Sequence, residues 1–299
     1  MSCQRGCGQT RGAIRPIPAP PTTNYGSIYE PGTIIVDAGS DLFSELVLTS
    51  AVRDLPNREF IILSGTPAIW GFFPNVRVFD GPEVETSFSW TPITPFLTRS
   101  RGHDVFQIAA DRFREAGIVI DRGPSLCHLP SPPDPGRKPP DGVLIVTGEP
   151  GTIGILPPEL VREVTESLSG GGVRVTEISG VEPYETLLKA ILGAEIVVCP
   201  PGAAHLISCG AYEGQNPEHG RKTILLMGGA WPGGGLPGIR QVVLESWHRV
   251  PCSGGGCGCL LAGEGPKASD RCHRSGNGVP YCMERYPVYE IVSAVESLL

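Results

Sequence analysis

The sequence has no long apolar run and, at its start, no basic segment followed by an apolar one. A helix that crosses a bilayer needs about 20 consecutive apolar residues. A secretory signal needs a positively charged region ahead of a short apolar core, and residues 1–13 do not have that pattern. We therefore expect a cytoplasmic protein without a transmembrane segment.

Charged residues are few as well, at 18% of the chain, and positive charge is not in excess. The formal net charge is −7 and the pI is about 5.4. Such a chain lacks the basic surface that attracts nucleic-acid phosphates, so nucleic acid is not an expected partner. The length of 299 residues allows two domains of ordinary size, each with its own core.

Prolines mark the segments that join the folded parts. Residues 1–31 carry prolines at positions 16, 18, 20 and 21 without an apolar period, which predicts an extended leader. Residues 124–141 hold seven prolines, a density that neither a helix nor a central strand tolerates. We interpret this second segment as the linker between two domains, residues 32–123 and residues 142–299.

Within each predicted domain, short β-branched runs alternate with helical patterns. The runs predict strands at 33–36, 60–63, 76–79, 143–146, 173–176, 195–198 and 223–227. The helical patterns fall at 41–55, 104–116, 158–169, 183–192 and 289–299. This alternation predicts an α/β fold: two Rossmann-like domains with mostly parallel sheets that face each other across a cleft.

Two small-residue turns follow successive predicted strands of the second domain. The first contains Gly202, Ala203 and His205 at the start of a helix, where backbone N–H groups bind phosphate. The second contains Gly228, Gly229 and Trp231, and the indole offers a surface for a nucleotide base. The alternatives are a tight turn with a core histidine, and a loop aromatic that shields the core.

Half of the ten cysteines fall in residues 252–282, before the closing helix. They are Cys252, Cys257, Cys259, Cys272 and Cys282. This stretch is rich in glycine and poor in apolar residues, so packing alone cannot order it. Four thiolates around one Zn²⁺, or three thiolates and an imidazole, would supply the missing folding energy. We favour a structural zinc over free thiols, with a disulfide as the remaining alternative.

Three stretches resemble the ADP-heptose:lipopolysaccharide heptosyltransferases, glycosyltransferases of the GT-B fold. Residues 195–209 are similar to the family's strand followed by Asp-Ser/Thr-Gly-x-x-His-Leu, with Gly202 and His205 at the Gly and His. Residues 223–228 resemble the next strand, and Cys282-Met283 resembles the family's Cys-Met segment before the last helix. The resemblance implies a nucleotide-sugar donor, an acceptor hydroxyl and a last helix that crosses back to the first domain.

The sequence departs from the family at several motif positions. Pro200 replaces the motif's Asp, Ser44-Glu45 stands near the Gly-Asp pair of the first helix, and residues 147–151 lack the expected basic residue. Sugar transfer needs a base for the acceptor hydroxyl. The alignment makes Glu45 the first candidate and Asp41 the second, and the alternative for both is an acid favoured by the helix dipole. Backbone amides near Gly202 and Ala203, without a catalytic metal, would stabilise the leaving group.

The leading functional prediction is therefore a glycosyltransferase that moves a sugar from a nucleotide-diphosphate sugar to a carbohydrate or other hydroxyl acceptor. A non-catalytic binding or assembly protein that keeps the two-domain shell is the main alternative, because Pro200 replaces the motif's Asp. A glycosyltransferase of another family is the second alternative, since Pro201-Gly202-Ala203 also fits a His-Gly-Ala-like loop. Detection of nucleotide-sugar binding or hydrolysis would separate an enzyme from a binding protein.

Overall fold

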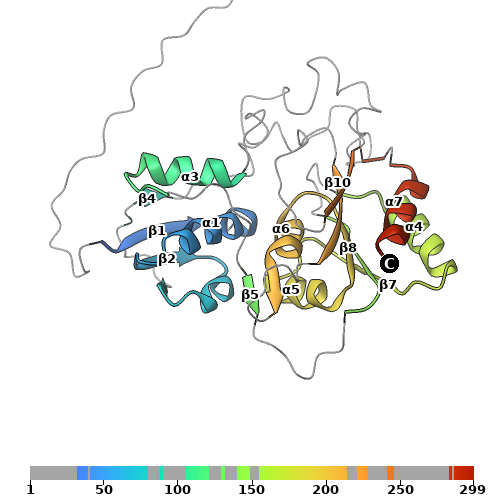
Figure 1. The fold of residues 1–299 in the computed structure, drawn as a ribbon, viewed down its shortest axis with the longest axis horizontal. Coiled ribbons are helices and arrows are strands. Elements are labelled where there is room, and N and C mark those ends of the chain that lie inside the picture. Colours follow the sequence, from blue (N-terminus) through green and yellow to red (C-terminus); the bar gives the residue numbers. More distant parts are fainter. Residues whose placement is uncertain are drawn as a thin grey trace, which may run out of the picture. The chain divides into compact units, whose positions relative to one another are not determined.

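Parallel β-sheets covered by helices form the framework of the protein, seen here in a computed structural model (Figure 1). The structure describes residues 32–39, 41–79, 86, 88–89, 105–120, 129–131, 140–148, 155–213, 221–227, 241–245, 283–284 and 286–299. The predicted leader, residues 1–31, lies outside them, and residues 32–299 form one compact unit.

The first sheet has the order β3-β2-β1-β4, and its neighbours are all parallel. Its strands are β1 (Ile34–Gly39), β2 (Phe60–Ser64), β3 (Val76–Phe79) and β4 (Phe88–Ser89). The helices of this part are α1 (Leu42–Asp54), the 3₁₀ helix η1 (Pro67–Phe72) and α3 (Val105–Glu115). Because β1 and β2 are parallel, α1 must return the chain along the sheet between them.

The second sheet has the order β11-β10-β8-β6-β7 and is also parallel throughout. Its strands are β6 (Val143–Val146), β7 (Val175–Ile178), β8 (Ile196–Cys199), β10 (Lys222–Met227) and β11 (Gln241–Glu245). Its helices are α4 (Pro158–Gly170), α5 (Tyr184–Gly193), α6 (Ala203–Gly210) and α7 (Val288–Leu298). A third, two-stranded sheet pairs β5 (Leu129–Ser131) with β9 (Ala211–Glu213) in parallel.

Strand β6 shows how the second sheet is buried on both faces. Val143 and Ile145 belong to a hydrophobic cluster with the apolar sides of α4 and α7. The alternate residues, Leu144 and Val146, belong to a second cluster with α5 and α6. Side chains alternate between the two faces of a strand, so a continuous apolar run such as 143–146 serves both clusters.

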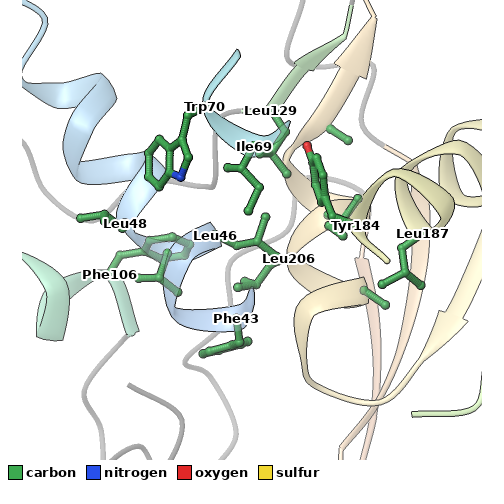
Figure 2. Packing of buried hydrophobic residues seen from close by; sticks show 14 of the residues in the cluster. Phe43, Leu46, Leu48, Ile69, Trp70, Phe106, Leu129, Tyr184, Leu187 and Leu206 are labelled. Carbon is green, nitrogen blue, oxygen red and sulfur yellow. The ribbon is translucent and has the colours of Figure 1, made fainter. Parts of the chain in front are cut away.

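The second cluster continues into the first part of the chain (Figure 2). Its members come from α1, η1, α3 and β5 as well as from α5 and α6, and they include Phe43, Leu46, Trp70, Tyr184 and Leu206. Helices α1 and α6 are in direct contact. The starts of these two helices, which carry candidate site residues, are thus joined by one buried core.

The predicted α/β class with parallel sheets is confirmed, and the separate sheets agree with two strand-helix series. Strand β7 begins two residues later than predicted, at Val175. The prediction missed β11 and the short β4, β5 and β9. The implied crossing of the last helix to the first domain is wrong for the described residues, because α7 packs on α4, β10 and β11. The domain boundaries and the cleft stay predictions.

Candidate functional site

The carboxyl ends of the central strands bring the predicted donor turn to one edge of the second sheet. Strand β8 pairs with β6 through Val198 and Ile145, and with β10 through Cys199 and Leu225. The segments that leave these strands therefore start at the same edge, which is where open α/β sheets bind ligands. Gly228, Gly229 and Trp231 follow β10 but lie outside the described residues, so their roles stay predictions.

Gly202 forms the turn between β8 and α6. Its φ of 156° and ψ of −164° belong to a region that only glycine occupies readily. A Cβ placed there would have no atom of the described residues within 4 Å. None of the described residues fills the space beside Gly202, while its backbone conformation disfavours any side chain.

Helix α6 starts directly after this glycine without a side-chain cap. Its first intrahelical bond runs from the Leu206 N–H to the Gly202 carbonyl, at 3.2 Å. The N–H groups that precede Leu206 have no acceptor inside the helix, and the helix dipole adds a partial positive charge. The start of α6 at Ala203 can therefore bind an anion such as phosphate.

Two further glycines, which the sequence analysis missed, bring two backbone segments into close contact at the same carboxyl edge of the second sheet. Gly148 and Gly180 each stand two residues beyond a strand end, and the Gly180 N–H donates to the Gly148 carbonyl at 3.1 Å. A Cβ on Gly180 would lie 2.7 Å from the Gly148 carbonyl carbon, so a side chain cannot fit. The sequence alone did not show this match, because the strand predicted at 173–176 ends four residues before Gly180, whereas the observed β7 ends at Ile178.

His205 is fully buried in the first turn of α6. Its Nε2 lies 3.0 Å from Oε1 of Gln241 at the start of β11 and 3.4 Å from Sγ of Cys209. Burial lowers its pKa from 6.5 to about 4, which leaves the ring neutral near pH 7. Its Nδ1 is buried and has no hydrogen-bond partner among the described residues. The sequence analysis did not identify Gln241.

The two cysteines near this turn behave as structural thiols. Cys199 is buried at the end of β8, and Cys209 is partly buried on α6. Burial raises the pKa of the Cys209 thiol to about 12 and that of Cys199 well above its usual value. Only the thiolate is nucleophilic, so neither residue is suited to covalent catalysis.

Asp41 caps the start of α1. Its Oδ2 accepts hydrogen bonds from the Ser44 N–H, at 3.2 Å, and from the Ser44 hydroxyl. Asp37, near the end of β1, accepts from the Gly39 N–H at 3.0 Å. Both carboxylates are half-buried and lie at the carboxyl edge of the first sheet, where Gly65 also donates to the Gly39 carbonyl.

Glu45 has a different environment from Asp41, although only one helical turn separates them. Its side chain is fully buried, and its carboxylate accepts from the Gly65 N–H and Trp70 Nε1, each at 3.1 Å, and from the Ser64 hydroxyl. Burial raises the pKa of this carboxyl, against the opposing effect of these hydrogen bonds. Through these hydrogen bonds, Glu45 connects α1 to the carboxyl end of β2 and to η1.

A pocket of about 680 Å³ opens elsewhere, at the amino ends of the first sheet's strands. Residues 32–34, 54–58 and 116–119 line it. Ligands of open α/β sheets bind at the opposite, carboxyl edge. The pocket is therefore not part of the candidate site.

The predicted metal ligands Cys252, Cys257, Cys259, Cys272 and Cys282 all lie outside the described residues. Within the described part of the chain, no three His, Cys, Asp or Glu side chains are grouped so that they could hold a metal ion. A search of the described helices for one long and apolar enough to cross a membrane found none.

Comparison with solved structures finds folds similar to this one among glycosyltransferases. The fold is similar to that of TibC from enterotoxigenic E. coli, an iron-containing dodecameric glycosyltransferase, with a TM-score of 0.61 and 14% identity over 89% of this chain and 75% of that one. It is also similar to a family 9 glycosyl transferase of Veillonella parvula, with a TM-score of 0.57 and 11% identity over 89% and 97%.

A second structure of TibC, described as a heptosyltransferase in complex with ADP-D-β-D-heptose, is also similar to this fold. The TM-score is 0.55, with 14% identity over 89% of this chain and 76% of that one. No family model and no curated protein matches the sequence. At these identities the likeness concerns the fold. The predicted resemblance to heptosyltransferases is confirmed at that level.

Proposed function

We propose that the protein is a glycosyltransferase that moves a sugar from a nucleotide-diphosphate sugar to an acceptor hydroxyl. The observation that carries the proposal is the pair of helix starts joined by one core. Asp41 caps α1, Gly202 begins the uncapped α6, and the two helices pack against each other. One start offers a carboxylate and the other an anion site, which are the two groups that sugar transfer needs.

On the donor side, the diphosphate binds to the N–H groups at the start of α6, next to Gly202 and Ala203. The space beside Gly202, which none of the described residues fills, supports this assignment, and so does the lack of a side-chain cap at Gly202. These amides stabilise the charge that develops on the leaving diphosphate. The base of the nucleotide lies near Gly228, Gly229 and Trp231, as the sequence analysis predicts. TibC, whose fold is similar, has been seen with ADP-D-β-D-heptose.

On the acceptor side, we assign the general base to Asp41 ahead of Glu45. The half-buried Asp41 lies at the carboxyl edge, whereas Glu45 is fully buried and binds three donors from its own chain. A base must come within hydrogen-bond reach of the proton that it removes. In this proposal Glu45 holds the carboxyl end of β2 and the helix η1 in place, and Asp41 removes the proton of the acceptor hydroxyl.

The cysteine-rich segment, residues 252–282, holds one structural metal ion in this proposal. Its composition supports a metal, since five cysteines occur in a glycine-rich stretch with little to pack. Zinc is the predicted ion. Because TibC is described as iron-containing, iron is the second candidate, and metal analysis of the purified protein distinguishes the two.

The test of the proposed function is a transfer assay combined with binding measurements. We expect one nucleoside diphosphate among ADP, UDP and GDP to bind, and its sugar conjugate to be consumed when an acceptor glycan is present. Binding without hydrolysis or transfer, for any acceptor tried, would favour the non-catalytic alternative, which the buried Pro200 at the motif's Asp position supports. No binding of any nucleotide would contradict the proposal.

A further inference from the structure

The hydroxyl group of Tyr286 lies at the carboxyl ends of two neighbouring strands. It donates to the carbonyl of Met227, the last residue of β10, and it lies 2.7 Å from the carbonyl oxygen of Leu244 in β11. Tyr286 belongs to neither strand, because it precedes helix α7. A phenol has one proton, so the two carbonyl oxygens share it in a three-centre hydrogen bond. Tyr286 therefore joins the carboxyl ends of β10 and β11.

The packing of its ring fixes the position of the Tyr286 hydroxyl. The ring is buried and belongs, with the fully buried Met283, to the hydrophobic cluster formed with α4 and α7. A buried tyrosine combines an apolar ring with a polar end that needs a hydrogen-bond partner. The segment before α7 thus places one hydrogen-bond donor where β10 and β11 end.

Met227, which Tyr286 holds, lies beside the proposed donor turn. The register in which β10 pairs with β8, continued for two residues, places Met227 level with Pro201, directly before Gly202. Neighbouring strands are about 5 Å apart. The side chain of Met227 is buried in the same cluster as Ala204 and Leu206 at the start of α6, and α6 is in contact with β10. The turn that we predict to hold the nucleotide base starts one residue after Met227.

We propose that Tyr286 is a positioning residue for the base of the nucleotide-sugar donor. By holding the Met227 carbonyl, Tyr286 fixes the direction in which the chain leaves β10 toward the predicted base turn. Binding groups need such support, because small displacements cost affinity. Tyr286 acts through Met227 and does not itself touch the donor. The inference rests on the proposed function, because the base belongs to the proposed donor.

The first experiment uses the three methionines of the chain as probes. In protein labelled with ¹³C at the methionine methyl groups, Met227→Leu identifies the Met227 signal. We expect the best-bound nucleoside diphosphate to shift this signal in the wild-type protein. If calorimetry shows binding and the Met227 signal does not move, the carboxyl end of β10 is not part of the donor site. That result overturns the inference and leaves the proposed function intact.

The second experiment removes the hydroxyl of Tyr286 and, as a matched control, a hydroxyl at the other end of β10. Thr223 is also buried, and its Oγ1 lies 2.6 Å from Ser208 Oγ and donates to the Arg221 carbonyl at 3.2 Å. Tyr286→Phe and Thr223→Val each remove one buried hydroxyl, so we expect similar losses of Tm. Only Tyr286→Phe should weaken binding of the nucleoside diphosphate, by roughly 5- to 10-fold.

Inorganic diphosphate separates a positioning role from a general loss of structure. It has no base and binds only at the start of α6 in the proposed function, so Tyr286→Phe should change its affinity by less than about 2-fold. Three results would overturn the inference alone: an unchanged nucleotide Kd in Tyr286→Phe, an equal weakening in Thr223→Val, or an equal weakening of both ligands. A wild-type protein that binds no nucleotide overturns the proposed function, and the inference with it.

Discussion

The buried His205 predicts a specific loss of stability in mild acid. Its pKa is lowered from 6.5 to about 4 by burial, so the folded protein keeps the ring neutral where the unfolded chain protonates it. The stability contributed by the neutral ring is present above pH 6.5 and is lost as the pH falls from 6.5 toward 4.

The size of the loss follows from the same two values. Linkage between pH 7 and pH 5 gives a decrease of about 2 kcal/mol in the free energy of unfolding. For a chain of 299 residues, that corresponds to a fall of roughly 3 °C in Tm. Glu45, whose pKa is raised, acts in the opposite sense: its contribution is present below its unfolded pKa and is lost as the pH rises through its folded pKa.

The assay is urea unfolding of wild-type and His205→Gln protein at pH 7 and pH 5. The variant cannot titrate at position 205, while Glu45 and all other groups are common to both proteins. We expect the stability difference between them to shift in favour of the variant by about 2 kcal/mol between pH 7 and pH 5. An unchanged difference would refute the reasoning, since it would mean that the ring has a similar pKa in the folded and unfolded states.

Three further outcomes are expected. Asp41→Asn should keep the cap of α1, because asparagine also caps helices. The variant should transfer sugar roughly 10²-fold more slowly or worse, with an unchanged Kd for the donor. A normal rate of transfer would show that Asp41 is not the base. Glu45→Gln should lower Tm, because the amide cannot accept all the hydrogen bonds from Ser64, Gly65 and Trp70. The rate of sugar transfer should fall only as far as the variant loses folded structure. A variant with unchanged Tm and a roughly 10²-fold lower rate would instead identify Glu45 as the base. Elemental analysis of purified protein should find about one zinc or iron per chain, and protein that folds fully without metal would leave the cysteines of residues 252–282 as free thiols or disulfides.

The sequence was informative where local patterns decide the structure. Uninterrupted β-branched runs such as 143–146 and 196–198 are buried on both faces, and that composition predicts a parallel strand. Strand β11 was missed because it pairs only with β10, has exposed and half-buried side chains, and reads as a weak pattern. Strand β5 lies among prolines, which argue against a strand except at an edge, and its two-stranded sheet is such an edge.

The candidate site was predictable only in part. The glycine turn at Gly202 could be found because the turn and the helix are adjacent in sequence. The partner of His205 could not, because Gln241 follows 36 residues later and reaches the ring through the register of β10 and β11. The burial of Glu45 likewise depends on Ser64 and Trp70, which follow 19 and 25 residues later, whereas the alignment that ranked Glu45 above Asp41 uses only residues of the first helix.

The central claim, a nucleotide-sugar site at the start of α6, is tested most directly by calorimetric titration of a nucleoside diphosphate into three proteins. Gly202→Ala puts a side chain on the strained backbone at the site. Gly172→Ala is a matched control at φ 83° after α4, where a Cβ likewise meets none of the described residues within 4 Å. The account predicts binding by wild type and Gly172→Ala, and binding weakened about 10-fold or more in Gly202→Ala. Equal affinity of all three proteins, or no binding by any, would contradict it.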